Sequence, residues 1–122
     1  MPPTPAKRLT AYTIPAFLLL TGALALLSPT TLASAFGMPI PAYSHAAGFV
    51  QCIGGRNLTF GLISAVFASR EDLWVVGTMA EFLALDGAVD GWVCWKYAGL
   101  MAAAPHWVAA VGVPFVGMWL AG

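Results

Sequence analysis

Charge is scarce in this chain: five basic and five acidic residues make up 8% of its 122 residues. Soluble domains carry roughly 25% charged residues. The formal net charge is zero and no basic run is present, so the composition gives no support for nucleic-acid binding. The sequence also lacks a phosphate-binding glycine loop, a nucleophile elbow and a haem-attachment motif, which removes the enzyme classes that these motifs mark.

Cysteine and histidine are equally sparse, with two residues of each. Cys52 and Cys94 form no CxxC motif, and His45 and His106 are isolated, so no cluster has metal-ligand spacing. We therefore expect neither a metal nor a cofactor. The two cysteines are expected to be small apolar residues inside helices, with a disulfide or a redox dithiol as the alternatives.

Apolar residues dominate what is present, at 60% of the chain. A domain of this length cannot hide so much apolar surface, because small domains keep a large share of their area exposed. We therefore predict an all-α, integral membrane four-helix bundle whose outer faces contact lipid. Four apolar stretches predict helices over residues 14–34, 48–68, 73–95 and 98–120.

The N-terminal region allows two interpretations. Residues 1–10 are polar and proline-rich, and are expected to form a disordered cytosolic leader before a single transmembrane domain over residues 11–122. The first apolar stretch is predicted to be a retained membrane helix. Lys7, Arg8, the apolar run and the small residues 33–35 also resemble a cleavable signal peptide. Both interpretations keep Lys7 and Arg8 in the cytosol.

Ionisable residues inside the predicted membrane helices are the main functional signal. Such side chains cost at least a few kcal/mol each at membrane depth, and they normally face the bundle interior and find partners. The turn between the second and third predicted helices is centred near Glu71, and Arg56 and Asp86 each lie 15 residues from it. In an antiparallel hairpin these two residues share one level, so we predict an Arg56–Asp86 ion pair, with Glu81 as the alternative partner.

Helical spacing adds a prediction for Glu81. It belongs to a stripe whose other members are small: Gly77, Glu81, Ala84, Ala88 and Gly91. Because membrane helices approach closely along small residues, Glu81 is expected on a packing face.

The polar residues of the predicted helices form one candidate site. Residues that could transfer a proton are the candidate catalytic residues Glu81, Asp86 and His106. Residues that could hold an oxygen-bearing substrate group are the candidate substrate-binding residues Arg56, Asn57 and Asp90. Two alternatives remain open: the charges fix only helix pairing, or they form a proton or ion path.

The run GGRNLTFG, residues 54–61, contains the spacing G-x-R-N-x-x-x-G. It resembles the signature of a fungal family of small integral membrane proteins catalogued as domain of unknown function 4267, and the similarity extends over about residues 10–121. The resemblance implies four membrane helices and frequent encoding beside fungal natural-product pathways, with no established reaction. By architecture alone, the chain is more distantly similar to the DoxX-like four-helix membrane proteins.

These observations lead to one functional expectation and two alternatives. We expect a multi-pass protein, located in the endoplasmic reticulum membrane, that acts on or supports conversion of a lipophilic small molecule in fungal secondary-metabolite biosynthesis. The alternatives are a structural or partner-binding membrane subunit and a small oligomeric transporter. The expected partners are membrane lipids, a hydrophobic substrate, and further copies of the chain or other membrane enzymes of the pathway. Whether the protein is an enzyme stays open.

Overall fold

The computed structural model describes residues 2–122, which form five α-helices and no β-strand. The helices are α1 (Pro5–Leu27), α2 (Pro29–Ala35), α3 (His45–Ser69), α4 (Leu73–Ala98) and α5 (Leu100–Ala121). The predicted all-α class is confirmed. The second, third and fourth predicted helices correspond to α3, α4 and α5, and their boundaries differ from the prediction by at most three residues.

Helix α1 begins at Pro5, inside the segment that is expected from sequence to be a disordered leader. The hydroxyl of Thr4 accepts a hydrogen bond from the backbone N–H of Lys7 at 3.3 Å, and a proline follows in the first turn. A threonine N-cap and an early proline both favour the start of a helix. These local signals extend the helix into the polar N-terminal segment.

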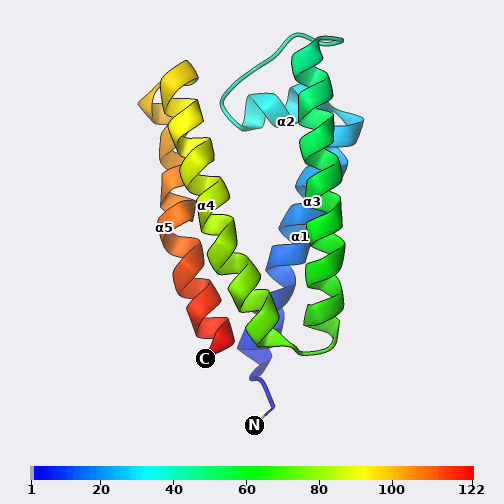
Figure 1. The fold of residues 1–122 in the computed structure, drawn as a ribbon, viewed down its shortest axis with the longest axis vertical. Helices are drawn as coiled ribbons and strands as arrows, with labels where there is room; N and C mark the ends of the chain where they lie inside the picture. Colours follow the sequence, from blue (N-terminus) through cyan, green and yellow to red (C-terminus); the bar gives the residue numbers. More distant parts are fainter. Residues whose placement is uncertain (1) are drawn as a thin grey trace.

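The first predicted helix, over residues 14–34, is broken in two at Ser28. This residue has φ −148° and ψ 72°, well outside the helical region. Pro29 follows it, and a proline ring disfavours the helical conformation of the preceding residue. As a result, α2 runs across the end of the molecule and does not continue α1 (Figure 1).

The four long helices form two antiparallel pairs, α1 with α3 and α4 with α5 (Figure 1). Both pairs pack through glycine. A Cβ atom at Gly54 would lie 2.7 Å from the Cβ of Ala25 on α1. In the second pair, Gly77 and Gly117 each lie against the other's backbone oxygen. Small residues at these points allow the backbones to approach closely.

The two pairs meet at the end that holds both termini and the α3–α4 turn, and they diverge toward α2 (Figure 1). Where they meet, a core cluster draws on all four long helices and contains Ala11, Ala68, Leu73, Val76 and Leu120. The Arg8 guanidinium also pairs with Glu71 of the turn, at 3.0 Å. The pairs are therefore joined mainly near the turn.

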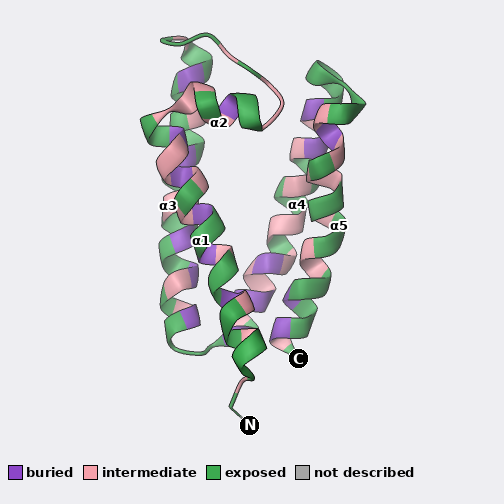
Figure 2. Ribbon diagram, turned by 180° about the vertical axis from the view of Figure 1, so that it is seen from behind, coloured by how far each residue is buried: buried purple, intermediate pink, exposed green. Residues whose placement is uncertain are grey.

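Most residues on the outer faces of the helices are exposed (Figure 2), and many of them are large and apolar. Phe17 and Phe115 are each 64% exposed, and Phe82 is 73% exposed. Within residues 2–122, α1 and α5 are long and apolar enough to cross a membrane. Only 28% of the apolar window of α1 and 11% of that of α5 is buried, which distinguishes both from the core helix of a soluble protein.

Candidate functional site

A partly open groove of about 300 Å³ lies between α3 and α4. Phe60 lines it from α3, and Met79, Phe82, Leu83 and Asp86 line it from α4. The spacing of Met79, Leu83 and Asp86, by four and then three residues, places them on one face of α4. Asp86 is the only ionisable residue among the five, so the groove is an apolar site with a single carboxylate.

The predicted Arg56–Asp86 ion pair is wrong. The one ion pair within residues 2–122 joins Arg8 and Glu71, and both Arg56 and Asp86 are exposed. Counting along the hairpin from the turn is still useful, since Phe60 and Phe82, 11 residues on either side of Glu71, both line the groove.

The predicted ion pair fails because the spacing from the turn gives the depth of Arg56 and Asp86 but not the lateral distance between α3 and α4. Helix α3 packs along α1, and α4 packs along α5, so α3 and α4 separate as they leave the turn. Equal depth on two diverging helices does not bring side chains into contact.

Three predicted site residues do lie near one another: Asp86, Asp90 and His106. Asp90 is one helical turn beyond Asp86 on the same face of α4, because residues four apart are neighbours on a helix. Both Asp86 and His106, the latter from α5, are close enough to act electrostatically on Asp90. The ionisable groups therefore continue from the groove along the α4–α5 pair.

His106 and Cys94 hold the segment that follows α2. The backbone carbonyl of Phe36 lies 3.1 Å from His106 Nε2 and 3.5 Å from Cys94 Sγ. A carbonyl can only accept, so Nε2 carries the proton of that hydrogen bond. The Phe36 ring also packs on the imidazole, with centroids 4.2 Å apart. This contact ties the first helix pair to the second at the diverging end.

Gly37 adds to the same contact. Its φ of +90° lies in the region that favours glycine, and a Cβ atom there would lie 2.8 Å from the Cβ of Ala102 on α5. The segment after α2 can therefore approach α5 closely only because this residue has no side chain.

Asn57 and Glu81 lie in helix contacts. The side-chain amide of Asn57 donates to the hydroxyl of Thr21 at 3.0 Å, across the α1–α3 contact. Glu81 packs against α5, where a Cβ atom at Gly117 would lie 2.8 Å from its Cγ. The prediction that Glu81 faces a packing surface is confirmed. Neither residue lines the groove.

The predicted small-residue stripe of α4 differs at one position. Ala88 is exposed, and Gly87 takes its place in the contact with α5. A Cβ atom at Gly87 would lie 3.2 Å from the Cβ of Ala110. Gly87 lies one residue before Ala88, so the contact departs from the strict alternation of four- and three-residue steps that the prediction assumed.

Sequence reasoning missed the apolar walls of the groove and the docking of Phe36. A signal for the walls exists: Met79, Leu83, Asp86 and Asp90 follow spacings of four, three and four, which is a second stripe of α4 beside the glycine stripe. Nothing in the local sequence marks Phe36, because its partners lie on distant helices. Cys52 and Cys94 are both free thiols, so the alternative of a disulfide is excluded.

The family comparison covers most of this structure. The model of the family described as Domain of unknown function (DUF4267) matches residues 16–120, which include the groove, the Asp90–His106 neighbourhood and both helix pairs. The chain belongs to this family. It matches no curated protein and no solved structure. The family description names no activity.

Proposed function

We propose that this DUF4267 protein is a four-span membrane protein that binds a lipophilic small molecule in the groove between α3 and α4. The observation that carries the proposal is the groove itself, with four apolar walls and one carboxylate. Ligand sites are usually concave and apolar, with a few polar groups that orient the ligand. At about 300 Å³, the groove has the volume of a small ligand site.

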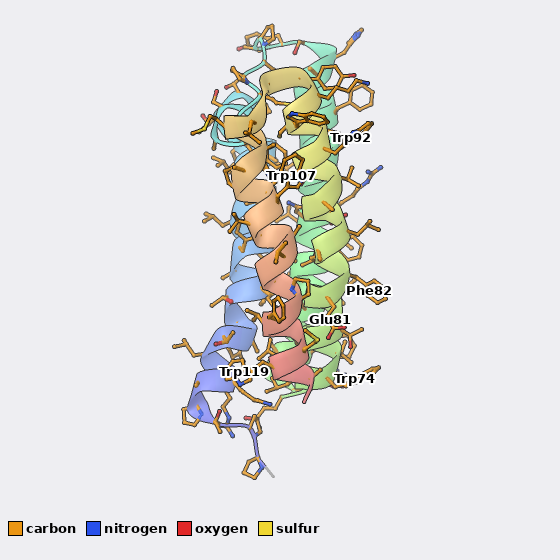
Figure 3. The ribbon with its side chains drawn as sticks, turned by 90° about the vertical axis from the view of Figure 1, so that its left-hand side faces the viewer. Trp74, Glu81, Phe82, Trp92, Trp107 and Trp119 are labelled. Carbon is orange, nitrogen blue, oxygen red and sulfur yellow. The ribbon has the colours of Figure 1, made fainter. Side chains whose placement is uncertain are left out.

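Helix length and aromatic placement support membrane insertion of all four long helices. They contain 23, 25, 26 and 22 residues, and a bilayer requires roughly 20. Trp74 and Trp119 lie near one end of the molecule and Trp92 near the other (Figure 3). On α4, Trp74 and Trp92 are about 27 Å apart at a rise of 1.5 Å per residue, close to the thickness of a hydrocarbon core.

Lysine side chains support the same boundaries. Lys7 Nζ lies 5.7 Å from the ring centroid of Trp119, and Lys96 Nζ lies 5.5 Å from that of Trp92. Aromatic rings with neighbouring lysines are typical of the headgroup region. Both termini lie at the end of the molecule where α4 begins, next to Trp74 in the sequence (Figure 1). With the basic N-terminus inside, both termini are cytosolic.

The ionisable groups favour a binding site over a purely structural role. A structural role would require Arg56 and Asp86 to pair, and they do not. Asp86 instead lines the groove, with Asp90 and His106 following it. A carboxylate and an imidazole in this order can accept and release a proton. Bound ligand could therefore exchange a proton with Asp86, while the apolar walls hold its hydrocarbon part.

The resemblance noted from the sequence directs the choice of ligand and membrane. We propose a lipophilic intermediate of a natural-product pathway as the ligand, and the endoplasmic reticulum as the membrane. Such intermediates partition into bilayers, so a groove that opens between membrane helices is reachable from lipid. Deletion of the gene followed by metabolite profiling would identify the accumulated compound.

A photoaffinity experiment tests the groove directly. A long-chain alcohol with a diazirine group is irradiated with the purified protein in nanodiscs, and the labelled peptides are identified by mass spectrometry. We expect labelling of the Met79–Asp86 segment, and loss of that labelling in Leu83→Trp, which fills the groove. Leu85→Trp is the matched control, because Leu85 lies on the same helix, is 67% exposed and does not line the groove. Equal labelling of both variants and the original protein would contradict the proposal.

A further inference from the structure

We propose that the ligand of this groove carries a basic nitrogen, so that the site recognises a lipophilic ammonium ion. This inference rests on the proposed function, since it names the ligand class of the same groove. Three features of the described residues carry it: the single carboxylate of Asp86, the aromatic rings of Phe60 and Phe82, and the negative charge that continues at Asp90.

The groove lining is complementary to a cation. Asp86 is its only ionisable residue, and two of its four other walls are phenylalanine rings. The face of an aromatic ring attracts an ammonium group, and this attraction grows when the cation is desolvated. A carboxylate among apolar walls also attracts an opposite charge more strongly than it would in water. The thioether of Met79 and the side chain of Leu83 then contact the hydrocarbon part of the ligand.

On the α4 side of the groove, the neighbouring ionisable residue is acidic, as Asp86 is. Asp90 lies one turn farther along that face and is within electrostatic reach of Asp86. His106 lies beyond Asp90, and its Nε2–H is used by the Phe36 carbonyl. The cation of Lys96 lies near the rings of Trp92 and Tyr97, at 5.5 and 5.1 Å from their centroids.

Arg56 is the cation on α3 nearest the level of Asp86, and it provides a test of ligand charge. It lies one helical turn from Phe60 on α3, at the level of Asp86, and does not line the groove. An anionic ligand would be held by Arg56, whereas an ammonium ligand would be repelled by it. Replacing Arg56 therefore has opposite effects on the two ligand classes.

Four probes with the same hydrocarbon chain measure the preference in the unmodified protein. Dodecylamine, dodecanol, dodecanoate and dodecylphosphocholine are titrated at neutral pH into protein in phosphatidylglycerol nanodiscs, with empty nanodiscs as the blank. We expect dodecylamine to bind at least tenfold more tightly than dodecanol and dodecanoate. Dodecylphosphocholine binding as tightly as dodecylamine would support ammonium recognition and assign the ligand to a lipid headgroup.

Three variants assign the preference to Asp86. We expect Asp86→Asn to weaken dodecylamine binding at least tenfold and to leave dodecanol binding within threefold. Glu81→Gln is the matched control, since it removes a carboxylate from the same helix on the face that packs against α5. Arg56→Gln should leave dodecylamine binding unchanged or tighten it a few-fold. Unchanged binding in Asp86→Asn, or weaker dodecylamine binding in Arg56→Gln, would overturn the inference.

The probe series also separates this inference from the proposed function. If dodecylamine and dodecanol bind equally and Leu83→Trp blocks both, the groove binds lipophilic molecules but does not select ammonium ions. If no probe distinguishes the original protein from Leu83→Trp, both proposals are wrong. The four-probe comparison uses the unmodified protein, so it tests the ammonium preference even if Asp86→Asn misfolds.

Discussion

In the α1–α3 pair, Gly22 and Gly54 let two helices touch through backbone and small side chains; in the α4–α5 pair, Gly77 and Gly117 do the same. The pairs differ in what lies beside that contact. The α1–α3 contact carries two hydrogen bonds between helices, from Asn57 to the Thr21 hydroxyl and from Gln51 to the Leu26 carbonyl. The second pair carries Glu81, Asp86, Asp90 and His106, and its α4 forms most of the groove.

This difference shows that one helix, α4, serves two purposes. The α4 face with Gly77 and Gly87 packs on α5, and the neighbouring face with Leu83 and Asp86 lines the groove. Since the packing face is made of small residues, it needs no large apolar side chains for stability. The second face is then free to carry ionisable groups.

The glycine contact of the α4–α5 pair should be the most sensitive point. We expect Gly77→Ala to lower the free energy of unfolding by about 2–3 kcal/mol, because the added Cβ would lie against the backbone oxygen of Gly117 and 2.9 Å from the backbone nitrogen of Ala121. Unfolding in mixed micelles, followed by circular dichroism, measures the change. Gly112→Ala is the control, since nothing lies within 4 Å of its added Cβ. Similar losses in both variants would contradict the predicted contact.

The corresponding contact in the α1–α3 pair should be slightly more tolerant. Gly54→Ala is expected to cost about 1–2 kcal/mol, because the added Cβ would lie 2.7 Å from the Cβ of Ala25 and 2.9 Å from the backbone oxygen of Gly22, contacts that are less close than the one at Gly77. Gly55→Ala, at the next residue, has open space around the added Cβ and should be neutral or slightly stabilising. The same unfolding assay applies. A cost at Gly55 equal to that at Gly54 would mean that α3 presents a different face to α1.

The hydrogen bond between Asn57 and Thr21 should make a moderate contribution. We expect a coupling free energy of about 0.6 kcal/mol, the average for side-chain hydrogen bonds between membrane helices. A double-mutant cycle of Asn57→Ala and Thr21→Val measures it. Thr21 also donates to the carbonyl of Phe17 within α1, so the single variants overestimate the interhelical term and only the cycle isolates it. A coupling of zero would show that the two side chains do not interact.

The docking of Phe36 should be detectable through a thiol. We expect His106→Phe to keep the ring contact and lose the hydrogen bond, which weakens docking by about 1 kcal/mol. Cys94 is buried beneath the docked segment, so its alkylation rate should rise about fivefold in a Cys52→Ser background. An unchanged alkylation rate of Cys94 in His106→Phe would mean that the hydrogen bond does not hold the segment after α2 in place.

The ion pair between Arg8 and Glu71 should have the smallest effect. Its side chains are 48% and 43% exposed, and exposed ion pairs contribute roughly 0.2–1 kcal/mol. Glu71→Gln should therefore lower stability by less than about 1 kcal/mol, and the difference should shrink as salt is raised. Thermal unfolding at two salt concentrations tests this. A salt-independent loss would contradict the electrostatic origin of this contribution.

Some site residues could be predicted from the sequence and others could not. Helical spacing correctly placed Glu81 on a packing face. The Arg56–Asp86 pair failed because spacing along a hairpin gives depth but not distance between helices. Phe36 could not be foreseen, since its carbonyl meets His106 and Cys94 only after α2 has crossed the end of the molecule.

Helix content, the apolar outer faces and the depth of each residue along its hairpin follow from the sequence, because capping, periodicity and rise per residue are local properties. Even the break at Ser28 has a local cause in Pro29. The choice of helix partners is different, since it depends on contacts between residues far apart in the chain. Gly54 reaches Gly22 and Gly77 reaches Gly117, and these two contacts separate α3 from α4. Because α3 and α4 are separated, Asp86 forms no ion pair with Arg56. Asp86 lines an apolar groove instead.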